Sequence, residues 1–170
     1  MNHPGGNAMK NLFRLMLIAC LVLPFAACKK AEAPKAEKPA AALPTNPADK
    51  AGWQAYMGDI VMRNMEGISN QPYAYLLPAE SEPDFQDQYD RLLDKAKSDV
   101  ARGIIAGNML AYGGPSSAKT ADMVVDAFKS VQPGTMKGVK VLFIGAPADG
   151  DRVKAAVEPA GVTYVFVEAK

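Results

Sequence analysis

The chain has 170 residues, of which 49% are hydrophobic, and its formal net charge at neutral pH is +1. This length is enough for one small domain with its own hydrophobic core. The near balance of charge, without a strongly basic face, argues against nucleic acid as a partner.

The N-terminal segment has the features of an export signal. Lys10 and Arg14 precede an apolar run of about 13 residues that ends in small side chains at residue 27. The run is too short to cross a bilayer as a helix, which takes roughly 20 residues. Met9 is a more natural start for such a signal than Met1. We therefore expect residues 1–27 to be a signal peptide that is removed.

The end of this signal carries a short motif. Phe25-Ala26-Ala27-Cys28 resembles the lipobox of bacterial lipoprotein precursors, whereas a second frame at 17–20 leaves only a stub of apolar residues. The resemblance implies that Cys28 is acylated and begins the mature chain, which holds it on a membrane because each buried CH₂ contributes about 0.8 kcal/mol. Lys29 follows, not the Asp that retains similar lipoproteins at the inner membrane, so we expect the periplasmic face of the outer membrane. An ordinary cleaved signal or an uncleaved anchor is the alternative.

Cleavage before Cys28 also limits the chemistry that remains. It removes His3 and Cys20, the only histidine and the only other cysteine of the chain. A Ser-His-Asp triad, a Cys-His pair and the usual zinc sites are then excluded. Carboxylate, lysine, tyrosine and Ser-Lys chemistry remain possible. We therefore expect no metal and no cofactor, and we favour a protein that is not an enzyme.

The mature chain divides into a tether and a domain. Residues 28–47 consist almost entirely of Ala, Pro, Lys and Glu after the cysteine. Such a segment buries too little apolar surface to offset its ordering entropy, so we expect a disordered spacer. Residues 48–170 have a mixed composition and a net charge of −3, and we expect them to form a single domain.

Residues 48–67 predict the first amphipathic helix of this domain. Apolar side chains recur there at helical spacing, namely Trp53, Tyr56, Met57, Ile60, Val61 and Met65. The thioethers of Met57, Met62 and Met65 could serve a soft ion such as Cu(I). Packing is the simpler interpretation, because methionine fills irregular gaps in hydrophobic cores.

Residues 73–77 lie between prolines and predict a short edge strand. Tyr73 and Tyr75 would point to the same side of such a strand. If they are exposed, they suit a partner surface; packing is the alternative.

A second amphipathic helix is expected over about residues 84–102, from its apolar periodicity. Ser81 or Asp84 can cap the start of this helix, and Gly103 can end it.

The C-terminal half contains an internal repeat with an offset of 32 residues. Residues 109–117, MLAYGGPSS, match residues 141–149, VLFIGAPAD, and each copy is followed by a helical pattern. A third apolar strand at 162–169 ends the chain. This order predicts an α/β fold with a small βαβαβ parallel sheet and both crossover helices on one face. The two N-terminal amphipathic helices would cover the other face.

The first turn of the repeat, GGPSSAKT at 113–120, is close to the phosphate-binding pattern G-x-x-x-x-G-K-[ST]. Ala118 stands where that loop has glycine, and Pro115 removes a backbone N–H. Ser116 and Lys119 also have the spacing of the Ser-Lys pair of penicillin-recognising enzymes, but the other motifs of those enzymes are absent. We therefore expect no nucleotide here, and a turn in which Ser116 or Ser117 caps a helix.

A small-ligand site remains possible at this turn. Ligands of open parallel sheets bind beyond the carboxyl ends of the strands, and free N–H groups at two helix starts could hold a small anion. The residues expected at this edge are Gly113, Gly114, Ser116, Ser117, Gly145 and Asp149. Two ordinary capped turns are the alternative.

Three functions follow from these patterns. The first is a lipid-anchored, non-catalytic domain that binds another envelope protein, as an inhibitor, immunity or accessory module. The second is a binder of a small anion at the strand edge. The third is a cell-wall hydrolase with two carboxyls about 5–10 Å apart, for which the candidates are Glu66, Glu80, Glu82 and Asp84.

Overall fold

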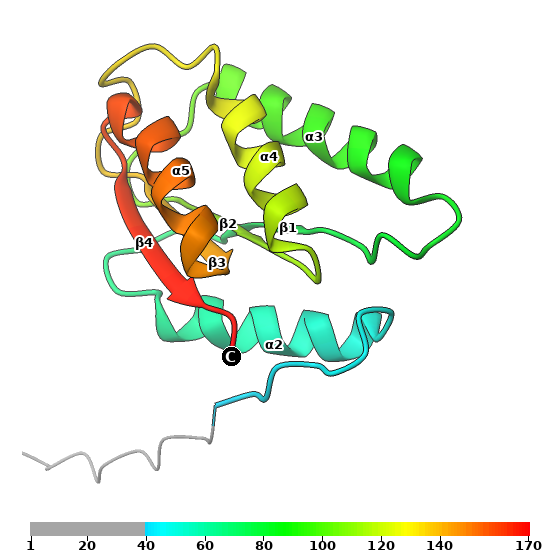
Figure 1. Ribbon diagram of the computed structural model, residues 1–170. Helices are drawn as coiled ribbons and strands as arrows, with labels where there is room; N and C mark the ends of the chain where they lie inside the picture. Colours follow the sequence, from blue (N-terminus) through cyan, green and yellow to red (C-terminus); the bar gives the residue numbers. More distant parts are fainter. Residues whose placement is uncertain (1–39) are drawn as a thin grey trace, which may run out of the picture. The chain divides into compact units, whose positions relative to one another are not determined.

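The computed structural model describes residues 40–170, which belong to one compact unit. The predicted signal, Cys28 and most of the predicted tether lie outside the described residues. The described part is an α/β fold with a four-stranded parallel sheet and four α-helices (Figure 1). The elements in chain order are α2 (Lys50–Arg63), β1 (Tyr73–Leu76), α3 (Phe85–Ala101), β2 (Met109–Gly113), α4 (Ser117–Phe128), β3 (Lys140–Gly145), α5 (Pro147–Val157), the 3-10 turn η1 (Glu158–Ala160) and β4 (Thr163–Glu168).

The strands stand side by side in sequence order, β1-β2-β3-β4, and every neighbouring pair is parallel. A parallel pair needs a crossover connection, and here each crossover contains one helix. Because all three crossovers step in the same direction, the rule of right-handed crossovers puts α3, α4 and α5 on the same face. Their buried side chains share one cluster with residues of β1, β2 and β3, including Tyr75, Tyr112 and Phe143.

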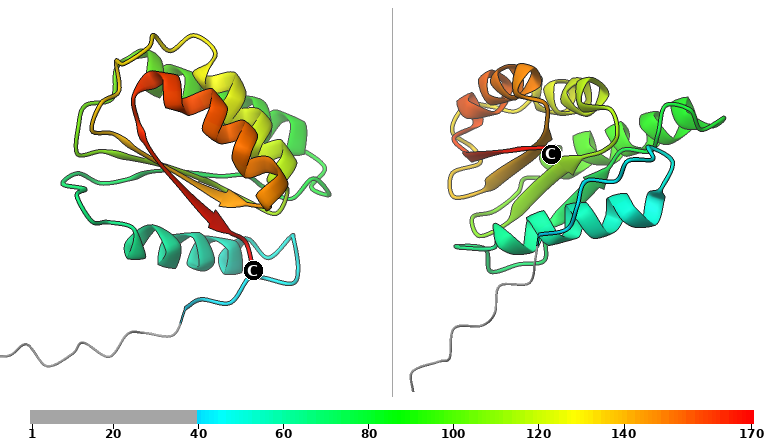
Figure 2. Two further views of the ribbon diagram at one scale, coloured as in Figure 1. Left: turned by 60° about the vertical axis from the view of Figure 1, so that its left-hand side comes forward. Right: turned by 60° about the horizontal axis from the view of Figure 1, so that its bottom comes forward.

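The sequence predicted that both N-terminal helices cover the face opposite α4 and α5. This prediction is wrong for α3, which lies on the same face as α4 and α5. Among the helices of residues 40–170, only α2 covers the second face, where its residues pack on Met109, Leu142 and Ile144 (Figure 2). The reason is that residues 73–76 pair in parallel with β2. That pairing makes the following helix a crossover, so α3 joins α4 and α5.

The repeat predicted from the sequence is confirmed in structure. β2 followed by α4 and β3 followed by α5 are two equivalent strand–turn–helix units, and both strands are almost completely buried. Ser116 caps α4, since its side chain accepts from the N–H of Lys119. Gly103, with φ of +85°, follows the last turn of α3 and ends it, as predicted.

Candidate interaction surface

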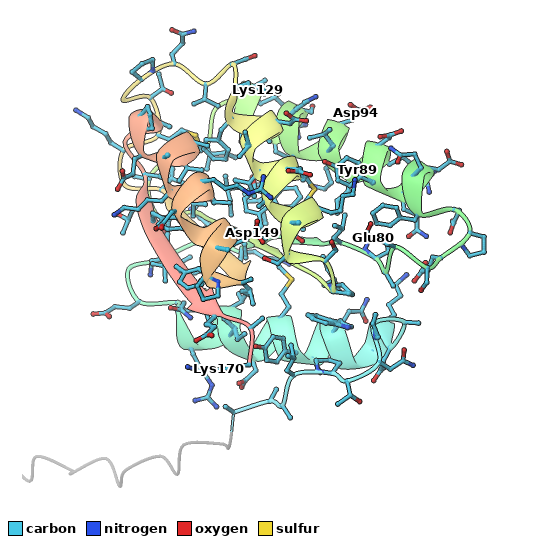
Figure 3. The ribbon with its side chains drawn as sticks, in the orientation of Figure 1. Glu80, Tyr89, Asp94, Lys129, Asp149 and Lys170 are labelled. Carbon is cyan, nitrogen blue, oxygen red and sulfur yellow. The ribbon has the colours of Figure 1, made fainter. Side chains whose placement is uncertain are left out.

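The two repeated turns meet at the carboxyl edge of β2 and β3. Ser117 Oγ donates to Asp149 Oδ2 at 2.6 Å and accepts the N–H of Ala146 at 2.7 Å. Figure 3 shows Asp149 in the first turn of α5. The predicted edge residues Ser117, Gly145 and Asp149 are therefore brought together, but Ser117 bonds to Asp149 and lies against Gly145.

Arg152 closes this network from the exposed side. Its guanidinium contacts Asp122 at 2.6 Å and Asp149 at 2.9 Å, and it also donates to the carbonyl of Ala118 at 2.7 Å. The hydrogen bond to Asp122, and secondarily that to Asp149, raises the pKa of Arg152 against the effect of burial. A carboxylate with its own cation thus lies at the start of α5, where its charge opposes a bound anion.

The glycines of this edge serve close packing. A Cβ built on Gly114 would lie 2.8 Å from the carbonyl oxygen of Leu77. A Cβ built on Gly145 would lie 2.6 Å from Ser117 Oγ and 2.7 Å from the ring of Phe143. The more open Gly113 would have its Cβ 3.4 Å from Ile144. Gly114 and Gly145 therefore need glycine because neighbouring atoms fill the space, so a ligand is not required to explain them.

The strand order also bears on a ligand at this edge. Binding crevices of open parallel sheets form where the strand order reverses and helices depart to opposite faces. The order β1-β2-β3-β4 contains no reversal within the described residues. The reversal that usually creates a binding crevice is therefore missing at the carboxyl ends of β2 and β3.

The four candidate carboxylates do not form a catalytic pair. Glu82 and Asp84 both accept from Nε2 of Gln88, at 2.9 and 2.8 Å, so they lie on the same side of one loop and not across a cleft. Glu80 is exposed in the same loop (Figure 3). Glu66 lies beyond the amino end of the sheet, where its carbonyl accepts from Lys140 Nζ at 2.7 Å.

Two further groups predicted from the sequence are used in packing. Met57 is buried and Met65 half-buried under the sheet, whereas Met62 is 70% exposed, so the three thioethers do not converge. Tyr75 is completely buried and Tyr73 packs beside the same cluster. An exposed tyrosine pair is therefore wrong, because α3 covers that face of β1.

A buried carboxylate that the sequence analysis missed joins α3 to β1. Asp99 is 2% exposed and accepts from Tyr75 Oη at 2.7 Å and from Lys95 Nζ at 2.5 Å, and Arg102 contacts its second oxygen. Burial by itself raises the pKa of Asp99, but the hydrogen bonds from Lys95, Tyr75 and Arg102 outweigh it and hold the pKa below its usual value. The only signal in the sequence is the i, i+4 and i+3 spacing of these charges.

The tyrosines around Asp99 remain neutral. Tyr75 stacks on Tyr112 with ring centroids 4.7 Å apart. Burial is the main cause that raises the pKa of both phenols, and the charge of Asp99 adds to it. Lys95 covers this group from outside, 5.1 Å from the ring centre of Tyr75. Asp99, Tyr75 and Tyr112 are buried, whereas Lys95 and Arg102 reach Asp99 from the exposed side, which fits a role in joining the helix to the strand.

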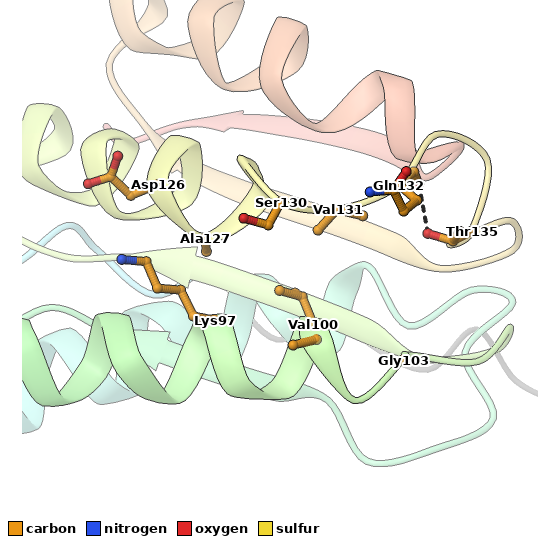
Figure 4. A pocket seen from close by; sticks show the side chains of 10 residues that line it. Lys97, Val100, Gly103, Asp126, Ala127, Ser130, Val131, Gln132 and Thr135 are labelled. Atoms are coloured by element: carbon orange, nitrogen blue, oxygen red, sulfur yellow. Dashed lines mark hydrogen bonds between the residues drawn. The ribbon is translucent and has the colours of Figure 1, made fainter.

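A groove of about 400 Å³ lies between the C-terminal parts of α3 and α4 (Figure 4). Val100, Ala127 and Val131 line it, and Lys97 and Asp126 stand on its two helices. Asp126 already pairs with Lys129. The groove is wide enough for a side chain of another molecule, but its lining does not select a particular one.

The outer edge of β4 is open. The N–H groups of Thr163 and Ala169 donate to Val139 and Gly145 on the side of β3, at 2.8 and 3.0 Å. Backbone groups of alternate residues point to opposite sides of a strand. Those of Tyr164, Phe166 and Glu168 therefore point away from β3, to a side where no other described segment pairs with β4.

A groove of about 590 Å³ accompanies this edge between β4 and α5. Phe166 is 37% exposed and stacks on Phe143 with ring centroids 6.2 Å apart. A Cβ built on Gly150 would lie 3.2 Å from the Phe166 ring, so glycine lets the ring approach the backbone of α5. Asp151, Lys154 and Glu158 also line the groove. The groove therefore combines an aromatic ring with charged side chains, and protein interfaces also contain both kinds of side chain.

The opposite edge of the sheet is protected, unlike β4. β1 has four residues between Pro72 and Pro78, and Lys95 lies over its tyrosines. Short strands, prolines and lysines are the usual means of preventing edge pairing. β4 has six residues, four of them β-branched or aromatic at its centre, and no proline or lysine. We therefore take β4 with the groove lined by α5 as the candidate interaction surface.

Comparison with protein-family models gave no match, and neither did comparison with curated proteins or with solved structures. Within residues 40–170, no helix has the length and apolar character needed to cross a bilayer. The same residues contain no cluster of three or more His, Cys, Asp or Glu side chains placed to hold a metal ion.

Proposed function

We propose that this chain is a lipid-anchored envelope protein whose α/β domain faces the periplasm and binds protein without catalysis. The observation that carries the proposal is the open edge of β4 beside the groove between β4 and α5. An extended segment can extend a sheet at such an edge, gaining main-chain hydrogen bonds for affinity and side-chain pockets for specificity.

The sequence supports the remaining parts of the proposal. The resemblance of 25–28 to a lipobox supports acylation of Cys28, and the Ala/Pro/Lys composition of 28–47 supports a spacer between membrane and domain. Position 29 is Lys and not the Asp that retains similar lipoproteins at the inner membrane, which supports the outer membrane. The mature chain would also lack histidine and a free thiol, which leaves binding as the simplest activity.

The anion-binding alternative receives less support. The hydroxyl of Ser117 and the carboxylate of Asp149 already bond to each other, and Arg152 neutralises that carboxylate. An anion would have to displace this network and approach a negative charge.

Lipidation can be tested by incorporation of labelled palmitate into the full chain in growing cells. We expect incorporation to be lost in Cys28→Ser and retained in Cys20→Ser, the matched control. Label that persists in Cys28→Ser would contradict an anchor at this residue.

The interaction surface can be tested with a photo-crosslinking amino acid placed at single positions of the full chain. Position 166 lies at the open edge, and position 62, 70% exposed on α2, is the control. We expect a discrete crosslinked protein product at 166 and none at 62. Equal or absent products at both positions would overturn the proposed surface.

A further inference from the structure

We infer that the segment covering this edge is β4 of a second copy, paired antiparallel about a two-fold axis at Phe166. The inference rests on the proposed function, since it names the partner of the same edge. It is carried by the backbone pattern of β4, by the groove beside it, and by the charges on each side of that groove.

The backbone pattern is self-complementary. Tyr164, Phe166 and Glu168 direct their N–H and C=O groups outward, because Thr163 and Ala169 bond to the β3 side. An antiparallel partner centred on Phe166 sets Phe166 opposite its own copy and Tyr164 opposite the second copy's Glu168. All three outward residues then form hydrogen-bonded pairs, and the two sheets become one of eight strands.

The side chains at the axis also fit a second copy. Phe166 lies against Gly150 and Phe143, on the face of β4 that carries α5. In the dimer, the exposed part of each Phe166 ring meets the ring of the other copy over the groove. Aromatic pairs opposite each other in antiparallel strands are among the favourable cross-strand contacts.

The charges are complementary under the same axis. Lys154 lies one helical turn beyond Gly150, about 6 Å towards the amino ends of the strands. Glu168 lies two strand residues beyond Phe166, roughly 6.6 Å in the opposite direction. Because the axis reverses these directions, Lys154 of each copy reaches the level of the other copy's Glu168. Both side chains are about half exposed, and their present partners are the exposed Glu158 and Lys170.

The same two-fold axis also favours a second lipid-anchored copy as the partner, rather than a protein that has no membrane anchor. It runs perpendicular to the joined sheet, so α2 lies on the same face in both copies. Ala41 and Leu43, near the start of the described chain, pack on that face, and Cys28 lies 13 residues before Ala41. Both acylated cysteines could therefore enter one membrane, where confinement raises the effective concentration of each copy for the other.

Disulfide trapping tests this register in cells that process the full chain. Residues opposite each other in a hydrogen-bonded antiparallel pair have Cα atoms about 5.5 Å apart, which is within disulfide range. We expect Phe166→Cys to give a disulfide-linked dimer on a non-reducing gel after mild oxidation. The parent chain and Met62→Cys are the controls, and neither should give this product.

A mixture of two variants tests the direction of the strands. Tyr164→Cys and Glu168→Cys should each give little dimer alone and a strong dimer when expressed together. If either variant alone gave as much dimer as the mixture, the antiparallel register would be overturned. This second arm also covers the case in which Phe166→Cys fails to fold.

The two proposals fail in different ways. A photo-crosslink from position 166 to another protein, without trapped dimers, would overturn the second copy and leave the proposed function standing. No crosslink and no trapped dimer would overturn both.

Discussion

Ser117 and Asp149 occupy equivalent positions of the two repeated units, 32 residues apart, and they bond to each other at 2.6 Å. The hydroxyl of Ser117 also accepts the N–H of Ala146, so one side chain connects the start of α4 to the start of α5. The two repeated units are therefore hydrogen-bonded to each other at the edge where a ligand was expected.

Ser117→Ala should destabilise the domain. The substitution leaves the N–H of Ala146 without its acceptor and removes one donor to Asp149, which costs about 1–3 kcal/mol for partly buried groups. Urea unfolding measures the change in free energy. Ser116→Ala is the matched control, because it removes only the cap of α4 and should cost about 1 kcal/mol. A smaller loss of unfolding free energy for Ser117→Ala than for Ser116→Ala would contradict a stabilising connection between the two units.

Gly145→Ala should destabilise the same edge by about 1–3 kcal/mol, because the added methyl group would overlap Ser117 Oγ and the Phe143 ring. Gly58→Ala is the control, since nothing lies within 4 Å of a Cβ there and the residue is exposed within α2. Alanine in an exposed helix interior should increase stability by roughly 0.5–1 kcal/mol. Thermal unfolding of both variants shows whether the two changes have opposite signs, as we expect.

The Asp99 cluster predicts a defined loss of stability in acid. The folded state holds the pKa of Asp99 below its usual value, so the unfolded state binds a proton first as the pH falls. The contribution of the Asp99 charge to the free energy of unfolding is complete above the unfolded pKa of about 3.9. It is lost as the pH falls through the lower folded pKa. Asp99→Asn should therefore be less stable than the parent at pH 7, and the difference should shrink as the pH falls below about 3.9.

Urea midpoints of both proteins across this range measure the effect. Asp94→Asn is a suitable control, because Asp94 lies exposed on α3 (Figure 3). A difference between parent and Asp99→Asn that stays constant with pH would show that the carboxylate charge has no part in joining α3 to β1.

Charge reversal tests the proposed contact between Lys154 and the second copy's Glu168. Glu168→Lys should weaken the dimer trapped through Phe166→Cys, because Lys154 of each copy then meets a cation at position 168 of the other copy. Adding Lys154→Glu should restore it, since the pair is recovered with its signs exchanged. The yield of disulfide-linked dimer at fixed expression is the measurement. Failure of the double change to restore the dimer would count against this alignment.

The sequence by itself determined the local elements. Periodicity located the helices, Gly103 marked the end of α3, and Ser116 marked the start of α4. The internal repeat indicated parallel strands, because two strand–turn–helix units in succession need crossovers. These features depend on neighbouring residues, so they can be recognised without knowing which distant segments meet.

Tertiary structure alone decided what those elements pack against. The short strand at 73–76 pairs with β2, 37 residues further along the chain, and this pairing moved α3 to the face of α4 and α5. The same pairing buried Tyr75 and placed its hydroxyl on Asp99. The bond between Ser117 and Asp149 closed the predicted ligand edge, and the end of the strand order left β4 open. Each outcome depends on contacts between residues far apart in the sequence, whose geometry is fixed only when the whole sheet assembles.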